Sequence, residues 1–97
     1  MYKIYFNRLV SETKTTEGRY SVSKIQADIE WFSGKEDHVL DFVAMYLTRA
    51  PEYNEAFVKD DETKKTVFSL GIREGKVYWA KGKVSFLSSV GGTEYNM

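Results

Sequence analysis

A tight hairpin is predicted by the stretch TVFSLGIREGKVYWAK, residues 66–81, and this hairpin decides the fold. In its first half every second residue is apolar, the alternation expected of a strand with one buried face. The dipeptide Glu74-Gly75 then predicts a two-residue turn. Such a turn pairs Leu70 with Trp79 across the hairpin, and paired residues share a face. The apolar faces of the two strands therefore coincide, which supports the hairpin independently of the turn.

Two more strands are predicted nearer the N-terminus. Residues 2–10 alternate apolar and polar side chains, as do residues 19–32. The polar stretch 11–18 between them ends near a glycine and predicts a turn. The apolar positions of the second strand change phase near Ser23, which predicts a β-bulge or a bend there.

One main helix is predicted between the two pairs of strands. The sequence SGKE at 33–36 fits a capping box, in which each end residue's side chain accepts a hydrogen bond from the other's backbone amide. The apolar stripe that follows has helical spacing as far as Ala50, and Pro51 then ends the helix. Residues 51–57 could form a short second helix, with the proline at its first position.

The predicted order is β-β-α-β-β, which indicates an α+β fold: an antiparallel sheet with one main helix packed across one face. The strands are residues 2–10, 19–32, 66–73 and 76–87, and their order within the sheet is left open. We expect residues 1–87 to form a single domain and residues 88–97 to be a flexible tail. The predicted core comprises Ile4, Phe6, Ile25, Ile29, Trp31, Val39, Phe42, Val43, Tyr46, Phe68, Leu70, Ile72, Val77 and Trp79.

The composition limits the classes of protein to which the chain can belong. Its 97 residues are 42% hydrophobic and 15% aromatic, which is enough for a folded core and more than a disordered chain contains. No cysteine is present, which favours a reducing compartment. The longest apolar run, residues 42–47, is too short to span a membrane. We therefore expect a soluble cytoplasmic domain that does not enter the membrane.

Residues that could support catalysis or metal binding are scarce. His38 is the sole histidine, so no Cys/His zinc site can form within the chain, and a Ser-His-Asp triad would need this one residue. Asp37 and Asp41 have a spacing that could hold Mg²⁺ or Ca²⁺, but acids in a first helical turn ordinarily complement the helix dipole. The glycines form no phosphate-binding motif. The sequence therefore predicts a protein that is not an enzyme, with no metal site and no cofactor.

Charge is unevenly distributed along a chain whose net charge is zero. Residues 34–62 contain eight acidic and three basic residues, whereas residues 63–97 contain two acidic and six basic ones. The acidic segment can be the solvated face of a helix and its loop, or it can dock onto a basic surface of another protein. As a protein-binding surface it comprises Glu36, Asp37, Asp41, Glu52, Tyr53, Glu55, Asp60, Asp61 and Glu62, with Met45 as a further apolar anchor.

A second candidate surface combines aromatic and basic residues of the last predicted strand with aromatic and basic residues of the other predicted strands. If Trp79 faces the helix, Tyr78 points to the open side of the sheet. Exposed tyrosines flanked by cations are how sheets bind single-stranded nucleic acid, although Tyr and Lys are also common on exposed strands for solubility. This alternative nucleic-acid surface comprises Tyr5, Lys24, Arg73, Lys76, Tyr78, Lys81 and Lys83.

These features favour binding rather than catalysis as the function. The first hypothesis is a small protein-binding module. An inhibitory role is suggested by class analogy, because phages and viruses use small cysteine-free α+β proteins to block host machinery. Nucleic-acid binding through the aromatic and basic face is the alternative. A homodimer is compatible with both, because the outer strands of an open sheet expose unpaired backbone groups.

Overall fold

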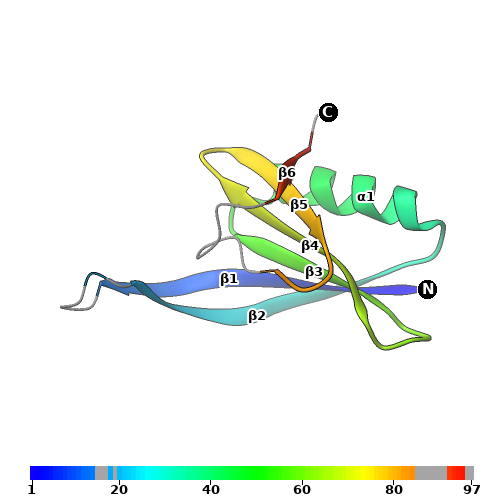
Figure 1. Cartoon of the computed structure of the whole chain (residues 1–97), viewed down its shortest axis with the longest axis horizontal. Coiled ribbons are helices and arrows are strands. Elements are labelled where there is room, and N and C mark those ends of the chain that lie inside the picture. The colour runs from blue at the N-terminus through cyan, green and yellow to red at the C-terminus, as the bar shows by residue number, and fades with distance from the viewer. Residues whose placement is uncertain (15–17, 19, 85–91, 96–97) are drawn as a thin grey trace.

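The computed structural model describes residues 1–14, 18, 20–84 and 92–95 of the chain. It has an α+β fold in which one helix packs against a six-stranded antiparallel sheet, and this confirms the predicted fold class (Figure 1). The elements in chain order are β1 (Tyr2–Lys14), β2 (Tyr20–Phe32), α1 (Glu36–Arg49), β3 (Glu55–Asp60), β4 (Thr66–Arg73), β5 (Lys76–Lys81) and β6 (Thr93–Glu94).

The strands lie in the order β2-β1-β3-β4-β5-β6, and every neighbouring pair is antiparallel. The hairpin of β4 and β5 has the predicted register, with Leu70 opposite Trp79. Its turn is the predicted dipeptide, in which Glu74 and Gly75 have φ angles of 53° and 77°. Two positive φ angles define a type I′ turn, whose twist matches that of the flanking strands.

Strand β3 replaces the short helix predicted for residues 51–57, and that prediction is wrong. A turn follows α1, and β3 then runs between β1 and β4 in the middle of the sheet. Ala56 and Val58 are fully buried on the helix side, and Phe57 between them points to the other face. A helix here would leave the facing edges of β1 and β4 without backbone partners, so tertiary pairing overrides the local pattern.

Helix α1 begins later than predicted, and the capping box expected at 33–36 does not form. The N-cap residue is Lys35, with no capping hydrogen bond from its side chain. Gly34 precedes it with a φ of +153° and packs so closely on Phe32 that a Cβ would lie 2.9 Å from Cε1 of the ring. The link from β2 to α1 is therefore shaped by this tight glycine turn rather than by side-chain capping.

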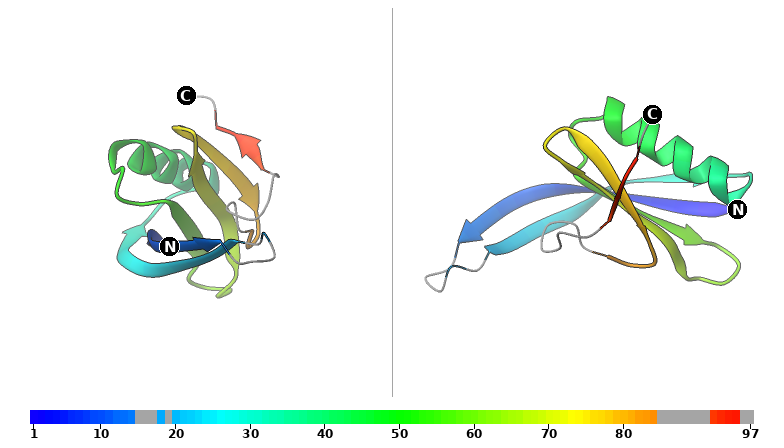
Figure 2. Two further views of the ribbon diagram at one scale, coloured as in Figure 1. Left: turned by 90° about the vertical axis from the view of Figure 1, so that its left-hand side faces the viewer. Right: turned by 45° about the horizontal axis from the view of Figure 1, so that its top comes forward.

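The core lies between α1 and one face of the sheet, where the helix crosses β3, β4 and β5 (Figures 1 and 2). The buried apolar side chains are Ile4, Phe6, Val39, Val43, Ala44, Leu47, Ala56, Val58, Phe68, Leu70 and Val77. Phe42, Tyr46, Ile72 and Trp79 are partly buried against this set. The predicted core is confirmed in β1, α1, β4 and β5, and its errors lie in β2.

The prediction that Ile25, Ile29 and Trp31 belong to the core is wrong. Ile25 and Trp31 are 44% and 50% exposed, and Ile29 is half-buried. The register with β1 explains the error, because Glu30 pairs with the buried Ile4 and therefore shares the helix side of the sheet. Ile29 and Trp31, on either side of Glu30, point to the opposite face.

Two features of β2 explain why Ile29 and Trp31 lie on the face away from the helix: a bulge, and the position of the strand at the edge of the sheet. Ala27 is skipped in the register with β1, so the apolar positions before and after it fall on different faces. A second register shift lies beside Ser23, where the sequence predicts a bulge or bend in the second strand, but the skipped residue is Val10 of β1. β2 is also an edge strand, and its ring contact with α1 is made by Phe32 at its end, so burial under the helix does not select which face is apolar in the rest of the strand.

The long hairpin of β1 and β2 extends away from the helix and gives the molecule its elongated shape (Figures 1 and 2). The overall dimensions are 46 × 27 × 22 Å. Of the predicted tail, residues 92–95 are described and include β6, which pairs with β5, while residues 88–91 and 96–97 lie outside the described residues. No helix within the described part of the chain has the length and apolar character needed to cross a membrane.

Candidate functional site

The fold disperses the acidic residues that the sequence groups into one surface. Glu36, Asp60 and Glu62 gather at one end of the molecule around Tyr2. Burial raises the pKa of the Tyr2 hydroxyl, and these three carboxylates raise it further. This acidic end therefore contains only part of the predicted protein-binding set.

Two other members of that set have partners of their own. The carboxylate of Asp61 accepts a hydrogen bond from Lys64 at 2.9 Å, which lowers the pKa of the Asp61 carboxyl. The carboxylate of Asp41 accepts a hydrogen bond from the Tyr95 hydroxyl, which ties the segment around β6 to α1. Asp37 is exposed in the first turn of the helix, where its charge is favourable to the helix dipole.

Glu55 lies on the opposite side of the sheet from these acids and is only 5% exposed. Its carboxylate accepts hydrogen bonds from the Lys24 ammonium and, at 3.0 Å, from the side-chain amide of Asn7. We call Asn7, Lys24 and Glu55 the Glu55 cluster. Next to it the backbone amide of Leu9 donates to the side chain of Asn54. These contacts join β1, β2 and β3 at the base of the long hairpin.

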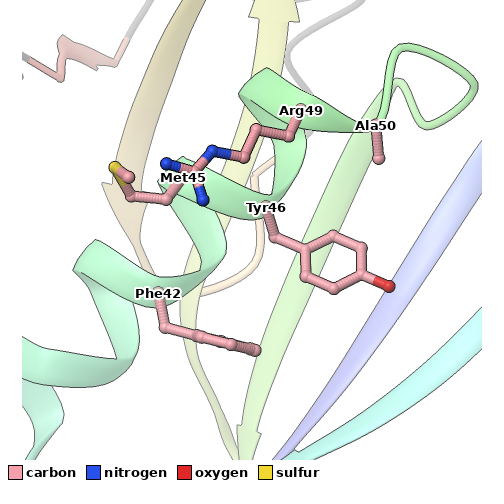
Figure 3. Close-up of a pocket in the computed structure, with 5 residues that line it drawn as sticks. All are labelled: Phe42, Met45, Tyr46, Arg49 and Ala50. Carbon is pink, nitrogen blue, oxygen red and sulfur yellow. The ribbon is translucent and has the colours of Figure 1, made fainter.

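A groove lies on α1, where Phe42 and Tyr46 point towards β1 and β2 while Met45 and Arg49 extend from the helix away from those strands (Figure 3). Its volume is about 370 Å³, and its lining residues are Phe42, Met45, Tyr46, Arg49 and Ala50. We call it the helix groove. Met45, which the sequence suggests as an apolar anchor, is 38% exposed. An apolar side chain is thus open to solvent in a concave part of the surface.

The rings of Phe42 and Tyr46 line the helix groove, and we call them its aromatic floor. The ring centroid of Phe6 in β1 lies 4.6 Å from that of Tyr46 and 5.1 Å from that of Tyr53. The ring of Phe42 lies 5.1 Å from that of Phe32 in β2. Separations of about 4.5–7 Å are those of favourable aromatic pairs. The helix is therefore fastened to β1 and β2 by rings that also give the groove a fixed apolar base.

Carboxylates stand around these rings. The Tyr53 hydroxyl donates a hydrogen bond of 3.1 Å to Asp28. Burial and this bond to the Asp28 carboxylate raise the pKa of Tyr53 to about 12. The pKa of Tyr46 is raised by burial and then by the charges of Glu30, Asp28 and Glu52. These three carboxylates lie near the rings of Tyr46 and Tyr53 but do not line the groove itself, and we call them the acidic rim.

Sequence reasoning missed two members of this rim, Asp28 and Glu30. The alternation in residues 19–32 assigns them to the face of β2 that points away from the core. In the structure they pair with Phe6 and Ile4 and lie on the helix side. Only the register of β2 against β1 carries this information, so no local signal could have identified them.

The face of the sheet opposite α1, which we call the open face, carries most of the residues predicted for nucleic-acid binding. The predicted residues found there are Tyr5, Lys24, Arg73, Lys76, Tyr78 and, beside a shallow recess, Lys83. The Arg73 guanidinium lies over the Tyr78 ring, 4.3 Å from its centroid. Lys81 differs from the rest, because it pairs with the buried Phe68 and so shares the helix side.

Further side chains join the open face because of the register. Trp31 stands beside Lys3, whose Nζ lies 5.2 Å from the ring centroids of both Trp31 and Tyr5. Phe57 pairs with Tyr5, and Lys59 pairs with Lys3. Sequence reasoning did not predict these open-face side chains, because Trp31 resembles a core residue and Phe57 falls in the segment predicted to be helical.

No three His, Asp or Glu side chains come together as candidate metal ligands among residues 1–14, 18, 20–84 and 92–95. His38 is exposed in the first turn of α1. Comparisons of the chain with protein-family models, with curated proteins and with solved structures found no match. Its function must therefore be argued from its own surfaces.

Proposed function

We propose that this chain acts by binding another protein, which places a segment with basic and apolar side chains in the helix groove. The observation that carries the proposal is the combination of exposed Met45 with an acidic rim of Asp28, Glu30 and Glu52. Apolar contact would supply affinity. Complementary charge would select the partner and speed its encounter with the groove.

The apolar part of the groove suits a protein side chain. Met45 is unbranched and polarizable, and methionine is enriched at protein interfaces. Phe42 and Tyr46 are already held by rings of β2 and β1, so the floor exists before a partner arrives. A preformed floor reduces the ordering cost of association.

The charge beside the groove favours a basic segment over an acidic one. Asp28, Glu30 and Glu52 stand close to the rings, whereas Arg49 is the basic residue in the lining. A lysine or arginine of the partner can lay its aliphatic stem on the aromatic floor and direct its charge to a carboxylate. An acidic segment would meet repulsion at the same place.

The proposed action is occlusion rather than chemistry. A chain that covers a basic surface of its partner excludes other ligands of that surface. On this ground the inhibitory role is retained as part of the proposal, with the partner identified only by its basic and apolar character.

Two designed peptides of equal length test the proposal. One carries Leu and Lys at helical spacing, so that one face is apolar and the other basic, and the second has Glu in place of Lys. The readout is the NMR signal of the Met45 methyl group in protein with isotope-labelled methionine methyls, assigned with the variant Met45→Leu. We expect the Leu/Lys peptide to shift this signal saturably and the Leu/Glu peptide to leave it unchanged.

Charge variants provide matched controls. Glu30→Gln and Glu52→Gln each remove one rim carboxylate and should weaken Leu/Lys peptide binding, most clearly at low salt. Glu62→Gln makes the same change at the acidic end and should have little effect. Equal weakening by all three variants, or no Met45 shift with either peptide, would count against the proposal.

A further inference from the structure

Beyond the protein binding proposed for the helix groove, we infer that the open face of the sheet is a separate binding site for single-stranded nucleic acid. Two observations on this face carry the inference. Aromatic rings from three adjacent strands reach its surface, and its charge is predominantly basic. Stacking on rings within a positive surface is the general way in which proteins hold single strands.

The strand register sets these rings at neighbouring positions. Tyr5 of β1 pairs with Phe57 of β3, and Trp31 of β2 stands beside Lys3, two residues along β1 from Tyr5. Adjacent strands lie about 4.8 Å apart, and successive side chains on one face lie about 7 Å apart. Trp31 is 50% exposed, so much of its ring is free to stack on a base.

Cations accompany the rings. The Nζ of Lys3 lies 5.2 Å from the centroids of both Trp31 and Tyr5. Towards the other edge of the sheet, Arg73 lies over the ring of Tyr78. A base stacked on one of these rings would bring its phosphate close to a positive charge.

The carboxylates of the open face do not offset this basic character. Glu55 is buried in the Glu55 cluster, where a lysine pairs with it, and Glu94 lies at the edge strand, 3.8 Å from Lys76. Asp61, which lies near Lys3, is hydrogen-bonded to Lys64. Lys59 and Lys83 form no ion pair with any other described residue. They are therefore placed to contact phosphate, the ligand that gives nucleic-acid binding its dependence on salt.

A recess of about 300 Å³ brings the two kinds of group together. Its lining includes the rings of Tyr5 and Phe57 and the cations of Lys59 and Lys83. Gln26 adds an exposed carboxamide, which can donate and accept hydrogen bonds at the edge of a base. An acidic peptide would leave the rings unused, and a duplex would keep its bases stacked within itself, so a single strand matches the recess best.

Fluorescence anisotropy tests the inference with labelled oligothymidylate, oligouridylate and a DNA duplex, each about 12 nucleotides long. We expect both single strands to bind more tightly than the duplex, and their affinity to fall as salt is raised from about 50 to 200 mM. Trp31→Ala should lower the affinity about 5- to 150-fold, the range for the loss of one stacked base. Trp31→Phe keeps a ring and should retain most of the affinity.

Charge reversals on the two sides of the sheet give the control. Lys59→Glu changes the open face, whereas Lys35→Glu makes the same change in net charge at the start of α1. Only the first should weaken binding of the single strands. Glu30→Gln, which probes the helix groove, should not weaken it, so this inference and the proposed protein binding can fail separately.

Three results would overturn the inference. The first is the absence of binding to both single strands at about 50 mM salt, where phosphate contacts are strong. The second is equal weakening by the two lysine variants, which would show attraction by net charge alone. The third is binding that Trp31→Ala leaves unchanged and that polyglutamate displaces, which would assign the open face to an acidic protein.

Discussion

Lys24→Met is expected to destabilise the protein much more than a change at an exposed lysine. The side chains of Lys24 and Glu55 are 17% and 6% exposed, so their ion pair is largely removed from water. Methionine preserves much of the apolar stem but removes the ammonium group. The Glu55 carboxylate would then keep the Asn7 amide as its hydrogen-bond donor among the described residues.

The size of the loss follows from this burial. Removing one partner of a buried ion pair costs about 3–5 kcal/mol, because the remaining charge is left uncompensated. Since Lys24 keeps some contact with water, we expect the lower end of that range, about 3 kcal/mol. In a domain of this size such a loss lowers the melting temperature by about 12–24 °C.

Urea denaturation of three variants measures the effect and its cause. In Lys24→Met/Glu55→Leu both charges are gone, and stability should return close to the wild-type value because an apolar pair replaces the ion pair. Lys64→Met is the control, because Lys64 pairs with Asp61 in an exposed turn and its loss should change stability little.

Two results would refute this reasoning. If Lys24→Met is as mild as Lys64→Met, the ion pair is effectively solvated and does not hold the base of the long hairpin. If the double variant is as unstable as the single one, the packing of the Lys24 stem matters rather than the compensation of the Glu55 charge.

Two further predictions concern the turn after β4 and a tyrosine beside the helix groove. Glu74 has a φ of 53°, where asparagine is better tolerated, so Glu74→Asn should raise the free energy of unfolding in urea by about 0.5–1 kcal/mol. No gain would contradict the type I′ assignment. The pKa of Tyr53 is raised from 10.0 to about 12, so the stability contributed by its neutral hydroxyl is complete below pH 10 and is lost as the pH rises through 12. Tyr53→Phe should therefore flatten the fall in unfolding free energy measured across this pH range, and an unchanged slope would show that another group causes the fall.

The elements that depend on neighbours in the sequence could be predicted. The turn at Glu74-Gly75 determines the register of β4 and β5, because a two-residue loop leaves one way to pair the strands. The helical spacing after residue 36 likewise places Val39, Val43 and Leu47 on one stripe, and all three are fully buried.

Prediction failed where the partner of a segment lies far along the chain. Residues 55–60 become a strand because β1 and β4 pair with both of their edges, and nothing within the segment indicates this. The alternation in residues 19–32 correctly predicts a strand, but it cannot tell which face the helix will cover. The position of Trp31 on the open face could therefore not be predicted from the alternation alone, because it depends on the pairing of Trp31 with Lys3.

The residues of the candidate surfaces likewise divide into those that local spacing identifies and those that only the pairing of distant strands brings together. Met45, Tyr5 and Tyr78 could be identified from helical or strand spacing, because each lies off the apolar stripe or row of its own element. The rim formed by Asp28 and Glu30 depends on the bulge at Ala27 and on the register of β2. A binding surface built across several strands is thus predictable only one strand at a time.

The acidic rim and the basic open face lie on opposite sides of the sheet, and this determines which experiments can identify the face that binds a ligand. The net charge of the chain is zero, so at distances beyond its own dimensions the attraction for a polyion largely cancels. Binding of a basic peptide or of a single strand must then come from one face at short range. Salt dependence alone cannot say which face is used, because screening weakens both. Paired variants on opposite faces, such as Lys59→Glu and Lys35→Glu, change the net charge by the same amount, so a difference between them reports the face directly.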